Sequence, residues 1–182
     1  MIAMIFVTVG THEQPFDRLV QYIDGLKRDG VIRESVILQT GYSVYEPRYC
    51  EWEKFFPYPV MQTRIQEARI IVTHGGPSSF IPALQIGKIP VVVPRQKKFG
   101  EHVNDHQVKF CRAAARRNAN LIVVEEIGDL KRVLLEYDSI AANMCANLSS
   151  CNQKFNERFR AVVSELIPEE NSARAERKGV FH

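Results

Sequence analysis

Short apolar runs that end in glycine-containing loops, each followed by an amphipathic helical segment, are the strongest constraint on the fold of this chain. The first run, residues 4–9 (MIFVTV), ends at Gly10, and apolar side chains recur at helical spacing through residues 16–26. A continuous apolar run of strand length is typical of a parallel strand covered on both faces. The pattern therefore predicts a strand, a loop and a helix as the first unit.

The same alternation continues along the chain. Further strands are predicted at residues 36–40, 50–56, 70–73, 89–93 and 121–124, and helices at residues 61–68, 80–87, 103–117 and 127–137. Such alternation requires right-handed crossovers and gives one parallel sheet flanked by helices. Ligands of such open sheets bind at the carboxyl ends of the strands. We expect a single α/β domain over residues 1–168.

The C-terminal part has a different period. Apolar side chains recur every three or four residues between residues 140 and 166, which predicts one long or kinked C-terminal helix that ends at Pro168. Residues 169–182 are charged and poor in apolar side chains, so we expect a mobile tail.

Composition argues against several classes of protein. The 24 Lys and Arg residues against 21 Asp and Glu give a net charge of +3, which offers no basic surface for nucleic acid. No apolar run approaches the roughly 20 residues of a membrane-spanning helix, and the N-terminus lacks the basic start of a signal peptide. The four cysteines form no CxxC pair, which is typical of reduced thiols in the cytoplasm. We expect a cytoplasmic protein.

A glycine-rich loop, residues 73–79 (THGGPSS), joins the clearest predicted strand to a helix. Its glycines allow backbone N–H groups to approach a ligand, and Ser78 and Ser79 lie at a helix N-terminus, where the dipole favours anions. A phosphate fits this loop, and a tight turn with a serine cap explains it equally well. The next loop, residues 94–102 (PRQKKFGEH), adds cations that could help to hold a diphosphate or form a solvated basic loop.

Two further loops belong to the same predicted edge. Residues 104–107 (NDHQ) begin a helix with side chains that could bind sugar hydroxyls or cap the helix. In residues 10–14 (GTHEQ), His12 and Glu13 could act as acid or base, or belong to an ordinary loop. His102 and His106 have the i, i+4 spacing of two metal ligands, but no third ligand is obvious, so we expect no metal.

Together these segments resemble a known family. The stretches FVTVGTH (6–12), THGGPSS (73–79), GKIPVVVPR (87–95) and EHVNDHQ (101–107) are similar to the C-terminal, donor-binding half of the GT-B glycosyltransferases related to MurG. The likeness is strongest to small subunits of split enzymes, namely the catalytic subunit that uses UDP-N-acetylglucosamine in dolichol-linked glycan assembly and bacterial PssE-type and capsule-synthesis proteins. The resemblance implies a Rossmann-like sheet.

Carried across by position, the resemblance implies a site and a reaction. The donor-binding residues would be Gly10, Thr11, His74, Gly75, Gly76, Ser78, Ser79, Arg95, Glu101, His102, Asn104, His106 and Gln107. His12 and Glu13 are catalytic candidates, and the base could instead lie on a partner. The reaction would invert the anomeric centre of a UDP-sugar with no cofactor or metal, because the helix dipole and loop N–H groups stabilise the leaving UDP. Where related enzymes often carry a ribose-binding glutamate, this chain has Pro82.

The resemblance also implies a setting. The chain would be a hexosyltransferase subunit that is active only with a membrane-associated, acceptor-binding subunit, which recruits it to the inner face of the plasma membrane. The acceptor would be a polyprenyl-diphosphate-linked sugar in bacterial exopolysaccharide or capsule synthesis, and residues 140–166 would dock the partner. The alternative is a non-catalytic nucleotide-sugar-binding module that regulates a transferase complex, a role that Pro82 favours.

Overall fold

Six parallel strands form the sheet of the computed structural model, which describes residues 3–116 and 120–146. The strand order is β3-β2-β1-β4-β5-β6. The chain adds β2 and β3 on one side of β1, then crosses back and adds β4, β5 and β6 on the other side. The strands are β1 Met4–Thr8, β2 Ser35–Gln39, β3 Glu51–Glu53, β4 Ile70–His74, β5 Val91–Val93 and β6 Ile122–Val123. The predicted Rossmann-like parallel sheet is confirmed.

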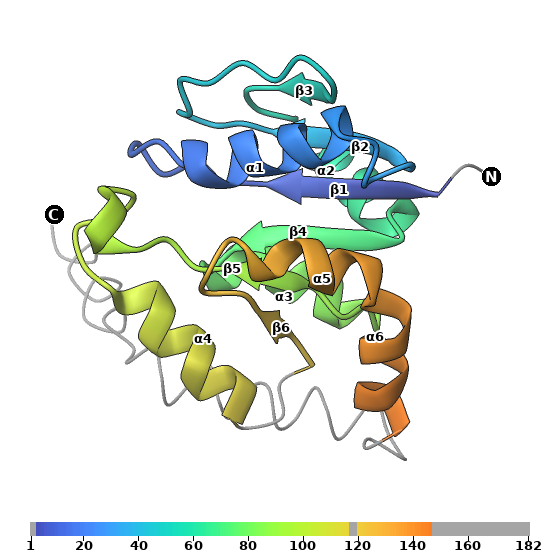
Figure 1. The fold of residues 1–182 in the computed structure, drawn as a ribbon. Coiled ribbons are helices and arrows are strands. Elements are labelled where there is room, and N and C mark those ends of the chain that lie inside the picture. Colours follow the sequence, from blue (N-terminus) through green and yellow to red (C-terminus); the bar gives the residue numbers. More distant parts are fainter. Residues whose placement is uncertain (1–2, 117–119, 147–182) are drawn as a thin grey trace, which may run out of the picture. The chain divides into compact units, whose positions relative to one another are not determined.

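Helices cover both faces of this sheet (Figure 1). One face is covered by α1 Asp17–Arg28 and α5 Asp129–Leu135, with α6 Tyr137–Ala146 following α5. The other face is covered by α2 Tyr58–Glu67 and α3 Pro77–Gln85. A short 3-10 helix, η1 Lys97–Phe99, precedes α4 His106–Arg116, whose Phe110 ring lies 6.1 Å from the Phe80 ring of α3.

Strand β1 illustrates why the sequence of a central strand is a run of apolar residues. All five of its residues are buried, and they alternate between the two faces. Ile5 and Val7 belong to the core under α1 and α5, whereas Met4 and Phe6 belong to the core under α2 and α3. Because helices cover both faces, both of these sets of side chains are apolar.

Several predicted boundaries move in the structure. The helix predicted from residue 103 begins at His106, because residues 101–105 form turns. The helix predicted to run to residue 137 ends before Glu136, and α6 starts anew at Tyr137. Of the long helix predicted at residues 140–166, only the part within α6 lies in the described residues, and the predicted tail at 169–182 lies outside them. No helix in the described ranges combines the length and the apolar character that crossing a bilayer requires.

The buried carboxylate of Asp24 fixes the long connection between β2 and β3 to helix α1. Asp24 is 1% exposed and accepts hydrogen bonds from the backbone N–H groups of Arg48 (3.0 Å), Tyr49 (2.8 Å) and Cys50 (3.1 Å). The Tyr45 hydroxyl donates a fourth bond of 2.8 Å. Burial acts to raise the pKa of Asp24, but these donors outweigh it and the pKa lies below its ordinary value.

Replacing Asp24 by Asn is therefore expected to destabilise the protein. The substitution keeps the shape but removes the charge and one acceptor oxygen, so we expect a loss of roughly 2–4 kcal/mol in the free energy of unfolding. Urea unfolding monitored by circular dichroism measures it. Asp29→Asn is the matched control, because Asp29 is an exposed partner of Arg28 at the end of the same helix, so this substitution should leave the free energy of unfolding almost unchanged. Equal losses in the two variants would contradict a structural role for the Asp24 carboxylate.

Candidate functional site

A cleft of about 650 Å³ opens at the carboxyl ends of β1 and β4, where the strand order changes direction. Its walls are the loop after β1, one side of α2, and the first turn of α3, with Gln107 of α4 at the side. This is the position at which open α/β sheets collect ligands. Eight of the residues predicted for the site line it, namely Gly10, Thr11, His12, Glu13, His74, Ser78, Ser79 and Gln107.

The imidazole of His74, at the end of β4, lies between two glycines. A Cβ atom at Gly10 would lie 2.3 Å from His74 Nε2, and one at Gly76 would lie 2.3 Å from His74 Cε1. Real Cβ atoms do not approach other atoms this closely. Gly10 also has a φ of +77°, which favours glycine independently. The two glycines are thus required by the histidine ring.

The hydrogen bonds of His74 define its tautomer. Its Nδ1 accepts a bond of 3.0 Å from the N–H of Gly76, so the proton is on Nε2, which donates to the Ser79 hydroxyl at 2.6 Å. Burial, followed by the nearby charge of Arg95, lowers the pKa of His74 to about 4. At neutral pH the ring is uncharged, and the Ser79 hydroxyl keeps its own hydrogen for a ligand.

His12 and His102 repeat this arrangement. His12 Nδ1 accepts from the N–H of Gln14 at 3.2 Å, and His102 Nδ1 accepts from the N–H of Asn104 at 3.4 Å. The two rings lie against each other with their centroids 4.8 Å apart and their planes tilted by 34°. Burial, His102 and Arg95 lower the pKa of His12, which favours its neutral form. Neutral His12 with an engaged Nδ1 is an N–H donor through Nε2, so among the two catalytic candidates the exposed carboxylate of Glu13 is the better proton acceptor.

Gln107 ties two of the loops together. Its Oε1 accepts hydrogen bonds from the N–H of Gly75 at 3.0 Å and from the N–H of Arg95 at 3.1 Å. The N–H groups of Gly75 and Gly76 are therefore engaged within the loop, and a ligand would meet the start of α3 instead. Pro77, the first residue of that helix, has no N–H, so Ser78 and Ser79 present the polar groups of the first turn.

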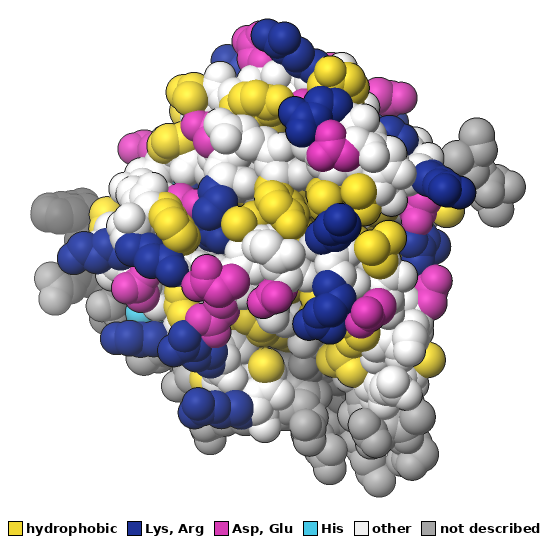
Figure 2. Space-filling model, in the orientation of Figure 1, with side chains coloured by type: hydrophobic (Ala, Val, Ile, Leu, Met, Phe, Trp, Pro, Cys, Tyr) yellow, Lys and Arg dark blue, Asp and Glu magenta, His cyan; other side chains and the backbone are white. Residues whose placement is uncertain are grey.

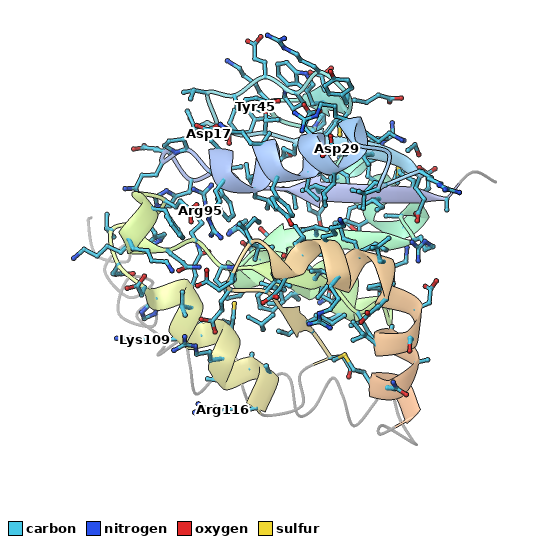
Figure 3. All side chains as sticks on the ribbon, viewed as in Figure 1. Asp17, Asp29, Tyr45, Arg95, Lys109 and Arg116 are labelled. Atoms are coloured by element: carbon cyan, nitrogen blue, oxygen red, sulfur yellow. The ribbon has the colours of Figure 1, made fainter. Side chains whose placement is uncertain are left out.

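Arg95 is inside the protein and does not line the cleft. Its side chain is 0% exposed and donates to the carbonyl oxygens of Gln14 (2.7 Å), Glu101 (3.1 Å) and Val9 (2.8 Å). Figure 3 shows it between α1 and the segment before α4, whereas Lys109 and Arg116 of α4 point outward. Burial lowers the pKa of Arg95 to about 10, so it stays charged at neutral pH.

Other residues of the predicted site also lie away from the cleft. Glu101 is 3% exposed and forms a two-point ion pair with Arg18, at 2.7 and 2.9 Å. Neither His102, Asn104 nor His106 lines the cleft. His102 precedes α4, so it does not share a helical face with His106, and the described residues contain no group of three or more His, Cys, Asp or Glu side chains arranged to hold a metal.

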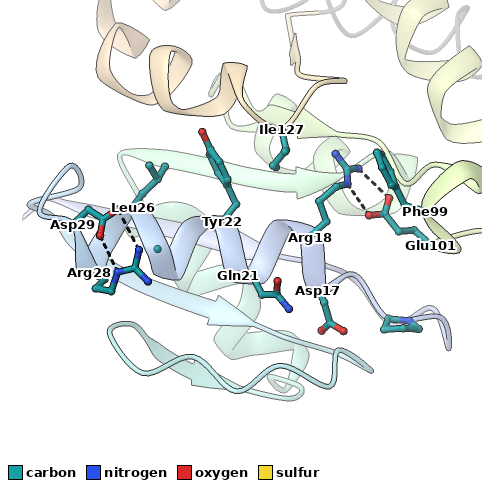
Figure 4. Close-up of a pocket in the computed structure, with 12 residues that line it drawn as sticks. Asp17, Arg18, Gln21, Tyr22, Leu26, Arg28, Asp29, Phe99, Glu101 and Ile127 are labelled. Atoms are coloured by element: carbon teal, nitrogen blue, oxygen red, sulfur yellow. Dashed lines mark hydrogen bonds and ion pairs between the residues drawn. The ribbon is translucent and has the colours of Figure 1, made fainter.

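A second hollow, of about 740 Å³, runs along α1 beside Phe99 and Ile127 (Figure 4). Its charged groups already have partners. Arg18 pairs with Glu101 and Arg28 with Asp29, and Asp17 accepts hydrogen bonds from two backbone N–H groups. Figure 2, which faces the same side of the sheet as Figure 1, shows hydrophobic side chains interspersed with charges of both signs over this region. Although it is larger, this groove offers no group of unpaired donors, so the smaller cleft at the strand ends is the better candidate site.

One wall of the cleft was not predicted from the sequence. Tyr58, Met61, Gln62 and Ile65 of α2 line it, and they follow the i, i+3, i+4, i+7 spacing of one helical stripe. That spacing is visible in the sequence, but the same spacing is expected of any helix that packs against the core. Gln39, at the end of β2, was missed because it lies within an apolar strand.

The contact between Gly76 and His74 predicts a coupled effect on stability. Gly76→Ala should cost about 1–3 kcal/mol of unfolding free energy, because its Cβ meets the buried ring. In a His74→Ala background the same substitution should cost less than about 0.5 kcal/mol. Gly128→Ala, where an added Cβ meets nothing within 4 Å, is the control for the glycine change itself. Additive losses in urea unfolding would contradict the proposed contact.

His74 also predicts a pH dependence of stability. The unfolded chain binds a proton near its ordinary pKa of 6.5, whereas the folded protein does so only near 4. The contribution of His74 to the free energy of unfolding is therefore fully present above pH 6.5. It declines as the pH falls toward 4, by roughly 3 kcal/mol in total. The decline between these pH values, measured by urea unfolding, should be smaller in His74→Gln. Equal declines would mean that His74 is protonated in the folded protein.

Comparison with known proteins places this geometry in a family. The chain matches the family described as "Glycosyltransferase family 28 C-terminal domain" over residues 4–166. No match was found among the curated proteins.

Solved structures with a similar fold include the glycotransferase of kitacinnamycin (TM-score 0.55, 16% identity, 91% of this chain and 43% of that chain). Spinosyn forosaminyltransferase SpnP gives a TM-score of 0.54 at 16% identity over 90% of this chain and 44% of that chain. The calicheamicin glycosyltransferase CalG4 gives a TM-score of 0.54 at 13% identity over 92% of this chain and 45% of that chain. The chain thus spans less than half the length of these proteins. Because the family match covers nearly all of its length, the chain belongs to the glycosyltransferase family 28 C-terminal domain family.

Proposed function

We propose that this chain is the donor-binding subunit of an inverting glycosyltransferase that uses a UDP-sugar. The observation that carries the proposal is the cleft between β1 and β4, which is lined by neutral hydrogen-bond donors and begins at the N-terminus of α3. Membership of a glycosyltransferase family supports it independently.

The cleft offers three regions for three parts of a sugar nucleotide. The diphosphate fits the start of α3, where the hydroxyls of Ser78 and Ser79 and the helix dipole favour an anion. The nucleoside fits the side of α2, where Tyr58 provides an exposed ring for the base. The sugar then extends toward His12 and the amide of Gln107.

In the proposed reaction an acceptor hydroxyl oxygen attacks the anomeric carbon as the bond from that carbon to the phosphate oxygen breaks. The oxygen's proton passes to a base, and UDP leaves with the electron pair of the broken bond. Glu13 or a group on a partner is the base. His12 Nε2–H and the first turn of α3 stabilise the departing diphosphate without formal cations.

A membrane-associated partner that carries the acceptor completes the proposal. The chain covers only 43–45% of the three glycosyltransferase structures compared above. The resemblance to split enzymes favours a polyprenyl-diphosphate-linked acceptor in bacterial exopolysaccharide or capsule synthesis, with the complex at the cytoplasmic face of the membrane.

Calorimetry and a transfer assay test the proposal together. The folded chain should bind UDP and at least one of UDP-glucose, UDP-galactose and UDP-N-acetylglucosamine, also in the presence of EDTA. Ser79→Ala should weaken UDP binding by roughly ten-fold through loss of a charge-assisted hydrogen bond. Ser35→Ala, in β2, is the matched control, because Ser35 does not line the cleft.

Transfer to a lipid-linked acceptor should require co-expression with a membrane-associated, acceptor-binding subunit. Absence of heat with every uridine nucleotide would contradict the donor site. Full transfer by the isolated chain would contradict the partner, and binding without transfer in any pairing would favour a regulatory module.

A further inference from the structure

We propose that Gln62 of α2 recognises the ribose of the bound nucleotide through hydrogen bonds between its side-chain amide and the 2′- and 3′-hydroxyl groups. The inference rests on the proposed function, because it concerns a nucleotide in the same cleft.

The polar side chains at the floor of the cleft already have partners. Thr8 Oγ1 accepts hydrogen bonds from the N–H of Gly10 at 3.2 Å and from Gln39 Nε2 at 3.1 Å. Gln39 Oε1 accepts from the N–H of Phe56 at 3.1 Å. Thr8 and Gln39 are 1% and 3% exposed, so they hold the strand ends together and have little capacity left for a ligand.

The polar groups on the side of α4 and β4 are also largely engaged. His74 uses both ring nitrogens within the loop, and Gln107 Oε1 accepts from two backbone N–H groups. What these residues leave for a ligand is the Ser79 hydroxyl, at the helix start assigned to the diphosphate, and the Gln107 amide N–H₂, which only donates. Donors suit a diphosphate, but a ribose hydroxyl is best bound by a group that both donates and accepts.

Gln62 is such a group, on the opposite wall. It lies in the middle of the α2 stripe between the apolar side chains of Met61 and Ile65. The side chain is half-buried, and no other described residue forms a hydrogen bond with its amide. A half-buried amide among apolar neighbours needs partners for its oxygen and its N–H₂ group, and a ligand in the cleft can supply both.

Helix α3, which faces α2 across the cleft, provides no polar side chain opposite Gln62. Ser78 and Pro82 both line the cleft and are one turn apart on α3, about 6 Å along the helix axis. A diphosphate at Ser78 therefore brings the attached ribose beside Pro82, which has no polar side-chain atom. Helices α2 and α3 share one hydrophobic core cluster, which contains Ile65 and Ala83. Ile65 is one turn after Gln62 on α2, and Ala83 directly follows Pro82 on α3. The ribose thus lies between Pro82 on one side and Gln62 on the other.

Calorimetry with UDP and with 2′,3′-dideoxyuridine 5′-diphosphate tests the assignment on the full chain. The wild type should bind UDP roughly ten-fold more tightly than the dideoxy nucleotide, as two ordinary hydrogen bonds require. In Gln62→Ala, UDP binding should weaken by about the same factor while binding of the dideoxy nucleotide stays unchanged, so the preference disappears. Gln66→Ala is the matched control, because Gln66 is exposed one turn later on α2 and does not line the cleft.

The outcomes separate this inference from the proposed function. If the wild type binds UDP but has no preference, or if Gln62→Ala keeps the preference, the role of Gln62 is wrong and the donor site stands. If the folded wild type binds neither nucleotide, the donor site itself is wrong. Unchanged binding of the dideoxy nucleotide by Gln62→Ala shows in the same experiment that the variant is folded.

Discussion

The buried guanidinium of Arg95 holds the candidate site together. A charge removed from water must be surrounded by dipoles, and here carbonyl oxygens from two separate loops fulfil that need. Val9 and Gln14 belong to the loop after β1, and Glu101 belongs to the segment before α4. The ring of Phe16 lies under the same group, 4.9 Å from its central carbon. The charge therefore fixes the positions of both loops at the edge of the cleft.

The fold was largely predictable because its main signal is local. Residues 4–7 and 70–72 form unbroken apolar runs, as expected of strands covered on both faces. The loops at the strand ends followed from the same reasoning, since parallel strands bring their carboxyl ends to one edge. Boundaries were less accurate where turns, such as residues 101–105, carry the spacing of a helix.

Individual side-chain roles were harder to predict, for a physical reason. Arg95 and Glu101 have the composition of a diphosphate site, yet each finds its partner far away in sequence, Arg95 at Val9 and Glu101 at Arg18. Whether a charged residue faces a ligand or the interior depends on such long-range pairing, which no local pattern reveals. The tautomers of the histidines likewise depend on backbone N–H groups whose positions exist only in the folded chain.

The packing of His74 between Gly10 and Gly76 has a consequence for how this site can evolve. With the ring in place, neither glycine can acquire a side chain. Without the ring, position 76 could accept one, whereas the positive φ at position 10 would still favour glycine. Substitutions at these positions therefore depend on one another, although Gly10 is separated from the others by more than sixty residues. Sequences that diverge from this chain should therefore replace Gly76 only when His74 is also replaced, and should keep Gly10 in either case.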